Sequence, residues 1–196
     1  MAEHPGAHLR RITLFTGSAS GSSPVFADGV REVVHALAGA GRGIVYGGGR
    51  VGLMGVAADA ALQAGAEVIG VMPQHLVDGE IAHTGLTALE VVPDMHARKL
   101  RMADLGDAFV ALPGGVGTLE ELFEVWTRQQ LGIHAKPVAL YDIEGYWQPL
   151  VAALDAMTVQ GFVAPRLREG LIVADDPSTL LTELEAWTPP AAKWGR

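Results

Sequence analysis

The chain contains no cysteine among its 196 residues. This absence excludes disulfides, thiolate zinc sites and cysteine nucleophiles. Basic residues are also scarce, because 14 Lys and Arg stand against 22 Asp and Glu and give a formal net charge of −8. A protein that binds a nucleic-acid backbone needs a basic face, so no nucleic-acid partner is expected. A small anion can still be held by backbone dipoles and a few basic side chains.

Long hydrophobic runs and metal-binding motifs are missing as well. No apolar run approaches the length of a membrane span, and residues 1–10 lack the apolar core of a signal peptide. We therefore expect a cytoplasmic protein without a membrane partner. Seven histidines are present, but none of them forms an H-E-x-x-H sequence, and no metal site is expected.

Short apolar segments alternate with helical patterns along the chain. Strands are expected at Ile12–Phe15, Ile44–Tyr46, Val68–Met72, Leu89–Val92, Phe109–Leu112, Val138–Tyr141 and Leu171–Val173. Helices are expected at Val25–Ala40, Leu53–Ala64, Met95–Leu105, Leu119–Leu131, Tyr146–Gln160 and Ser178–Trp187, and Pro73–Leu86 is expected to be a loop or lid. This alternation predicts a single-domain α/β protein with a doubly wound, mostly parallel, Rossmann-like sheet and helices on both faces. The domain would span 11–187, with flexible tails at 1–10 and 188–196.

The stretch Pro113–Glu121, P-G-G-V-G-T-L-E-E, follows one of these buried strands and leads into a helix. Glycines allow backbone to approach a ligand, and the first N–H groups of a helix have no partner of their own. The stretch therefore predicts a phosphate site. It is not a Walker loop, because no G-K-[ST] follows.

Glu121 has two interpretations at this stage. In Thr118-Leu119-Glu120-Glu121 it can complete a capping box, in which its side chain bonds to the first N–H of the helix. It can equally serve as a catalytic acid beside a bound phosphate ester. The residues alone leave both open.

Two further segments fall where such a fold binds ligands. Gly47–Gly52 satisfies G-x-G-x-x-G, but the acid with the spacing for a dinucleotide, Glu67, precedes its strand and would lie at the wrong end of the sheet. The segment Asp94–Lys99 begins a helix. There Arg98 can pair with Asp94 on a solvated face or bind a phosphate or ribose oxygen.

Taken together, these segments resemble the Lonely guy family of cytokinin-activating phosphoribohydrolases, whose members are often labelled lysine decarboxylases. The family's P-G-G-x-G-T-x-x-E pattern occurs as Pro113–Glu121, and its M-H-x-R-K pattern as Met95–Lys99. The resemblance covers roughly Ile12 to Val163, and Val77–Gly85 matches the family's glutamate-containing loop only through Glu80. No lysine has a pyridoxal-phosphate context, and no cofactor is expected.

The resemblance implies hydrolysis of the N-glycosidic bond of cytokinin riboside 5′-monophosphates, and of AMP, by a nucleotide-binding homodimer. It implies catalytic roles for Arg98 and Glu121 and phosphate binding by Gly114, Gly115, Gly117 and Thr118. It further implies phosphate or ribose contacts from Ser18, Gly48 and Lys99, and purine contacts from Glu80 and Met95. An apolar helix face around Trp126 could supply the dimer interface, although burial in the core explains it equally well. The alternatives are a nucleotide-binding sensor or carrier without catalysis and an NAD-linked enzyme.

Overall fold

The computed structural model describes residues 9–79 and 81–192. Its strands are β1 (Arg11–Phe15), β2 (Gly43–Tyr46), β3 (Val68–Pro73), β4 (Ala88–Val92), β5 (Ala108–Ala111), β6 (Val138–Tyr141) and β7 (Leu171–Ala174). Its helices are α1 (Pro24–Gly39), α2 (Gly52–Gln63), α3 (Gln74–Asp78), α4 (Met95–Leu105), α5 (Val116–Gln130), α6 (Gln148–Val159), α7 (Pro165–Glu169) and α8 (Pro177–Ala186). Every predicted strand and every predicted helix is present.

The strands form one seven-stranded sheet in the order β4-β3-β2-β1-β5-β6-β7, and each neighbouring pair is parallel. The order runs outward from β1 in both directions, so the winding reverses between β1 and β5. This arrangement confirms the doubly wound α/β prediction and makes the sheet wholly parallel. Ligands in such sheets bind at the carboxyl ends of the strands beside the reversal.

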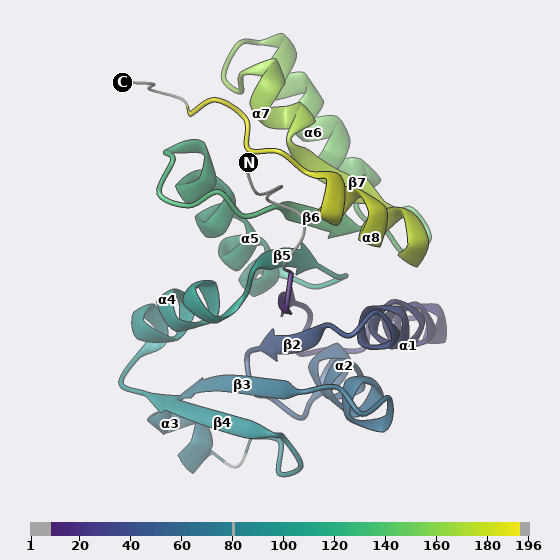
Figure 1. The fold of residues 1–196 in the computed structure, drawn as a ribbon, viewed down its shortest axis with the longest axis vertical. Helices are drawn as coiled ribbons and strands as arrows, with labels where there is room; N and C mark the ends of the chain where they lie inside the picture. Colours follow the sequence, from purple (N-terminus) through teal and green to yellow (C-terminus); the bar gives the residue numbers. More distant parts are fainter. Residues whose placement is uncertain (1–8, 80, 193–196) are drawn as a thin grey trace, which may run out of the picture.

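Helices cover the sheet on both faces, with α1 and α2 on one side and α4 and α5 on the other (Figure 1). Alternate strand residues point to opposite faces: Leu14 joins the core beneath α1, α2 and α8, whereas Phe15 joins the core beneath α4, α5 and α6. Trp126 is 3% exposed and belongs to the second core. Core burial therefore accounts for Trp126, and a dimer interface on this helix stays a prediction.

Three details differ from the sequence-based expectation. The segment expected to be a loop continues β3 to Pro73 and then forms the short helix α3, and Gly49 forms an isolated antiparallel bridge with Ala82. Tyr146 lies in the turn before α6 and not in the helix itself. The five-residue helix α7 was not predicted, because it is too short to show a helical period.

The tail predictions fall partly outside the described residues, since 1–8 and 193–196 lie beyond them. Residues 188–192 form neither helix nor strand, and Arg166 donates to the carbonyls of Ala191 and Ala192. Flexibility of the two tails stays a prediction. Among the described helices, none combines the length and the apolar character needed to cross a bilayer.

Candidate active site

Three loops meet at the carboxyl ends of β1, β2 and β5, as the sequence predicted. The Gly17 N–H donates to the Pro113 carbonyl over 3.1 Å and joins the loop after β1 to the loop after β5. The Met54 N–H donates to the Gly17 carbonyl over 3.3 Å and ties in the start of α2. A Cβ on Gly52 would lie 2.3 Å from the carbonyl carbon of Ser18, so this close packing requires glycine.

The start of α5 provides the expected phosphate socket. Gly115 is its N-cap residue, has no side chain and therefore leaves the first N–H groups of the helix uncapped. The first helical hydrogen bond runs from the Leu119 N–H to the Gly115 carbonyl over 3.1 Å. The N–H groups of the first turn are thus available to an anion, and the helix dipole favours one there.

The three glycines of the socket have different surroundings. A Cβ on Gly114 would lie 2.1 Å from Thr118 Oγ1 and 2.8 Å from the Gly17 nitrogen, so a side chain there would push the loops apart. A Cβ on Gly115 or Gly117 would meet no described atom within 4 Å. Gly114 is therefore required by packing, whereas the space beside Gly115 and Gly117 is free for a ligand.

Glu121 lies in the second turn of α5, the helix whose start forms the socket. Its Oε1 accepts a hydrogen bond from Arg98 Nη1 over 3.0 Å, and both side chains are 11% exposed. Because α5 begins at Val116, Thr118 is inside the helix and caps nothing. The capping-box interpretation of Glu121 is therefore wrong: this carboxylate bonds to Arg98.

Arg98 is held from three sides. Its Nε donates to the carbonyl of Val71 in β3 over 3.1 Å, while Nη1 donates to Glu121. A Cβ on Gly47 would lie 1.8 Å from Nη2, which explains why the loop after β2 has glycine at this position. Asp94 does not pair with Arg98; it caps α4 by accepting from the Ala97 N–H over 2.8 Å. The solvated-face interpretation of Arg98 is wrong.

Burial dominates the electrostatics of the carboxylate. Removal from water raises the pKa of Glu121 above its ordinary value, because burial disfavours the charged form. The positive charge of Arg98 opposes that rise, the negative charge of Glu120 adds to it, and Lys99 lowers it. A carboxyl group with a raised pKa beside a fixed guanidinium is suited to acid–base chemistry.

Lys99 connects α4 to α5. Its ammonium group contacts Glu120 and lies 2.6 Å from Glu124 Oε2, and both acids raise its pKa. Its contact with a phosphate or ribose stays a prediction, and that contact would compete with these two carboxylates. Glu120, the other acid of the motif, therefore has a structural partner that Glu121 does not share.

The remaining predicted contacts occupy several positions around the socket. Ser18 is exposed on the loop after β1, Met95 is 40% exposed at the start of α4, and Thr118 is 3% exposed. Gly48 is buried, has a φ of 79° and accepts at its carbonyl from the His83 N–H. Glu80 lies outside the described residues. Substrate contacts of all these residues stay predictions.

Tyr146 belongs to the candidate site, although the sequence analysis did not predict it. Its hydroxyl donates to the Gly114 carbonyl over 2.6 Å, and its ring meets Phe26 edge-on at 5.6 Å between centroids. With Leu53 the two rings border a cavity of about 270 Å³ that also touches Ser18, Gly114 and Gly115. The aromatic pair joins segments far apart in the chain, so no local pattern could have indicated it.

Other polar groups have structural partners. Glu67 lies at the amino end of β3 and pairs with Arg11 over 2.7 Å, far from the carboxyl ends where a dinucleotide would bind. His134 contacts the Val125 carbonyl over 2.9 Å. Within 9–79 and 81–192, no group of three His, Asp or Glu side chains is placed to hold a metal ion.

Comparison with known proteins identifies the family. The family model described as "Possible lysine decarboxylase" matches residues 54–184. The cytokinin riboside 5′-monophosphate phosphoribohydrolase of Rhodococcoides fascians is 46% identical over 168 residues, covering 85% of this chain and 85% of that protein. The chain belongs to this family, whose members include the Lonely guy proteins. A plant member, the phosphoribohydrolase LOG7 of Arabidopsis thaliana, is 41% identical over 95% of this chain and 86% of its own length.

Solved structures outside this close group share the fold. A molybdenum cofactor binding protein from Rippkaea orientalis has a TM-score of 0.69 at 20% identity, covering 92% of this chain and 98% of that one. The molybdenum cofactor carrier protein of Chlamydomonas reinhardtii has a TM-score of 0.68 at 21% identity, covering 91% and 97%. At this level of identity, the likeness of these proteins to a Lonely guy family member concerns the fold alone.

Proposed function

We propose that the protein hydrolyses the N-glycosidic bond of cytokinin riboside 5′-monophosphates, and of AMP, to the free base and ribose 5-phosphate. The observation that carries this proposal is the buried Arg98–Glu121 pair, whose Glu121 lies one turn into a helix with an uncapped start. The names of the relatives support the same reaction. The 5′-phosphate binds the socket, and the sugar extends from it toward Glu121.

The chemistry follows from the charge that develops on the sugar. When the C1′–N9 bond breaks, its electron pair leaves with the base, and the ribose ring becomes oxocarbenium-like. The ionised Glu121 stabilises that positive charge and accepts a proton from the water that attacks C1′. The departing base takes up a proton, so one water is consumed overall. Arg98 orients the ribose phosphate and donates a hydrogen bond to the departing base.

Phosphate binding supplies energy that positions the sugar. Contacts to the non-reacting phosphate can be used to hold C1′ beside Glu121, which raises the rate of the chemical step. The free N–H groups at Val116, Gly117 and Thr118 and the open space beside Gly115 suit this role. Ser18, Gly48 and Lys99 add contacts to phosphate or ribose, and Glu80 and Met95 contact the purine.

A sensor or carrier without catalysis would use the same socket but would not need Glu121 to ionise. The relatives that are more than 40% identical are named hydrolases, whereas the carrier proteins share 20% or 21% identity and the fold. We therefore prefer the hydrolase. The position of Glu67 likewise argues against an NAD-linked enzyme.

The proposal includes a cytoplasmic homodimer, as the family resemblance implies. Large apolar side chains remain exposed in the single chain, among them Val116 at 85% and Ile133 at 58%. Light scattering after gel filtration measures the mass in solution. A mass of twice the 20.6 kDa chain is expected.

The decisive experiment is a base-release assay. The purified protein is incubated with isopentenyladenosine 5′-monophosphate, with AMP, and with the riboside that lacks phosphate. Free base and ribose 5-phosphate in equal amounts are expected from the nucleotides, and little base from the riboside. Binding of the nucleotides without release would instead identify a sensor or carrier.

A further inference from the structure

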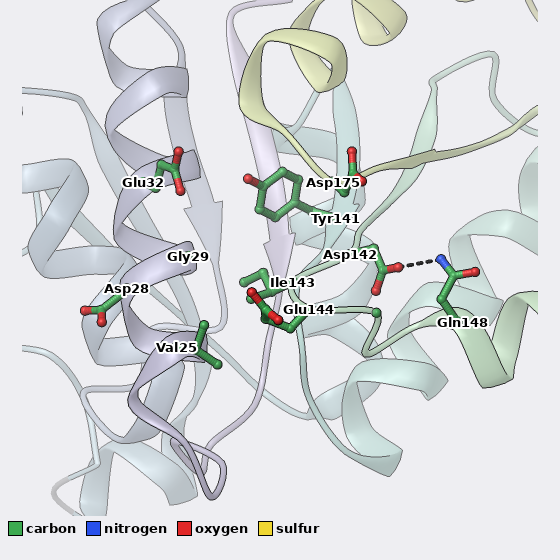
Figure 2. A pocket seen from close by; sticks show the side chains of 11 residues that line it. Val25, Asp28, Gly29, Glu32, Tyr141, Asp142, Ile143, Glu144, Gln148 and Asp175 are labelled. Carbon is green, nitrogen blue, oxygen red and sulfur yellow. Dashed lines mark hydrogen bonds between the residues drawn. The ribbon is translucent and has the colours of Figure 1, made fainter.

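A second cavity lies beside α1, and no residue of the three glycine loops lines it. It has a volume of about 600 Å³, within the size range of small-molecule pockets, and shares no lining residue with the cavity at Tyr146. Figure 2 shows carboxylates that reach it from α1, from the loop after β6 and from the loop after β7. The acidic members of its lining are Asp28, Glu32, Asp142, Glu144 and Asp175.

The charge of this cavity is not balanced. Its lining contains no Lys, Arg or His. Asp28 pairs with Arg31 over 2.7 Å, and Asp142 accepts from the Trp147 N–H over 2.7 Å and from Gln148. In the described parts of the chain, no ion pair neutralises the other three acids, which are Glu32, Glu144 and Asp175.

An independent feature of the cavity is the phenol of Tyr141. Tyr141 is 2% exposed, and its hydroxyl points toward α1 on the side of Glu32, whereas Asp175 lies on the other side of the ring (Figure 2). Among residues 9–79 and 81–192, this hydroxyl has no hydrogen-bond partner. Burial, together with Glu32 and the acids after β7, raises the pKa of Tyr141 to about 12, so the group stays an uncharged donor and acceptor at neutral pH. A phenol that lines the cavity without a partner among the described side chains is free to hydrogen-bond a ligand there.

We infer that this cavity binds a linear aliphatic polyamine between Glu32, Asp175 and Tyr141. A single metal ion does not suit the described residues, because no three of their acids are close enough together to ligate one. A polyamine carries several ammonium groups separated by methylene segments. The ammonium groups would meet the separate carboxylates and the Tyr141 hydroxyl, and the methylenes would pack on Val25 and Ile143.

The test uses calorimetric titration of the full-length protein with spermidine at low ionic strength. The double variant Glu32→Gln with Asp175→Asn should bind spermidine about tenfold more weakly than the wild type, because two facing charges are lost. Tyr141→Phe should also weaken binding. The matched control is Glu169→Gln with Glu183→Gln, which changes the net charge equally at exposed positions outside the cavity and should bind like the wild type.

Three results would overturn the inference. They are no measurable heat with the wild type, an equal loss in the control variant, and tighter binding of Mg²⁺ than of spermidine. Circular dichroism checks that each variant is folded. The site does not involve Arg98 or Glu121, so base release by the double variant should equal that of the wild type, and failure of the hydrolase proposal would leave this test unchanged.

Discussion

Arg98 Nη1 and Glu121 Oε1 lie 3.0 Å apart, although the two residues are separated by 23 positions and belong to different helices. Neither charge is well solvated, since each side chain is 11% exposed. The positive charge of Arg98 and the negative charge of Glu121 therefore compensate each other. This compensation links the stability of the site to its chemistry.

Removing Arg98 should leave a buried carboxylate without a partner. We expect Arg98→Ala to lower the free energy of unfolding by about 3 kcal/mol near neutral pH. The double variant Arg98→Ala with Glu121→Gln should recover part of that loss, because the uncompensated charge is gone. Urea denaturation of the wild type, both single variants and the double variant measures the coupling. If the change in the free energy of unfolding of the double variant equals the sum of the changes in the two single variants, Arg98 and Glu121 do not pair directly in solution.

The pH dependence should report Glu121. Because burial raises its pKa, we expect the acid limb of kcat to lie above the ordinary glutamate pKa of about 4.3, with activity lost as the carboxylate is protonated. The same shift affects folding, since a raised pKa favours the protonated folded state. The free energy of unfolding of the wild type, taken relative to that of Glu121→Gln, should be largest below the ordinary glutamate pKa. This difference should shrink as the pH rises through the raised pKa of Glu121. An acid limb within the ordinary range would refute this assignment.

The two glycines of the socket give a matched pair of substitutions. Gly114→Ala places a Cβ against Thr118 Oγ1 and the Gly17 backbone, so we expect a less stable protein with a disrupted loop junction. Gly115→Ala meets no described atom within 4 Å and should fold normally. Its methyl group would instead crowd the bound phosphate and raise KM for nucleotides about tenfold or more. Thermal unfolding and steady-state kinetics separate the two effects, and an unchanged KM in Gly115→Ala would place the phosphate elsewhere.

Tyr146→Phe should test the aromatic support of the socket. The hydroxyl bond to the Gly114 carbonyl is lost, at a cost of about 1 kcal/mol for a partly exposed neutral hydrogen bond. We expect KM to rise several-fold while kcat changes little, since the ring stays against Phe26. Phe26→Tyr, which keeps an aromatic ring at the same cavity, is the control. A fall in kcat with KM unchanged would give Tyr146 a different role.

The sequence predicted the fold well because its apolar segments are short and separated by clear helical periods. It also placed Gly17, Gly47 and Pro113 at one end of the sheet, where the structure joins their loops. It could not decide the role of Glu121 without the family resemblance. The pattern Thr118-x-x-Glu121 suggests a helix cap, and only the start of α5 at Val116 shows that this cap does not form.

Contacts between distant segments were beyond local patterns. The Tyr146 bond to Gly114 spans 32 positions, and the Lys99 contacts to Glu120 and Glu124 depend on how α4 packs against α5. Side-chain partners of this kind follow from tertiary packing. They change the interpretation of Lys99 from a free cation to one that is already paired.

The most direct measurement compares substrate binding and base release in Glu121→Gln. Glutamine can accept the same hydrogen bond from Arg98 but cannot take a proton from water. The account predicts a folded variant that binds isopentenyladenosine 5′-monophosphate like the wild type and releases base about 10²- to 10⁴-fold more slowly. Release at the wild-type rate would contradict a catalytic role for the Glu121 carboxylate.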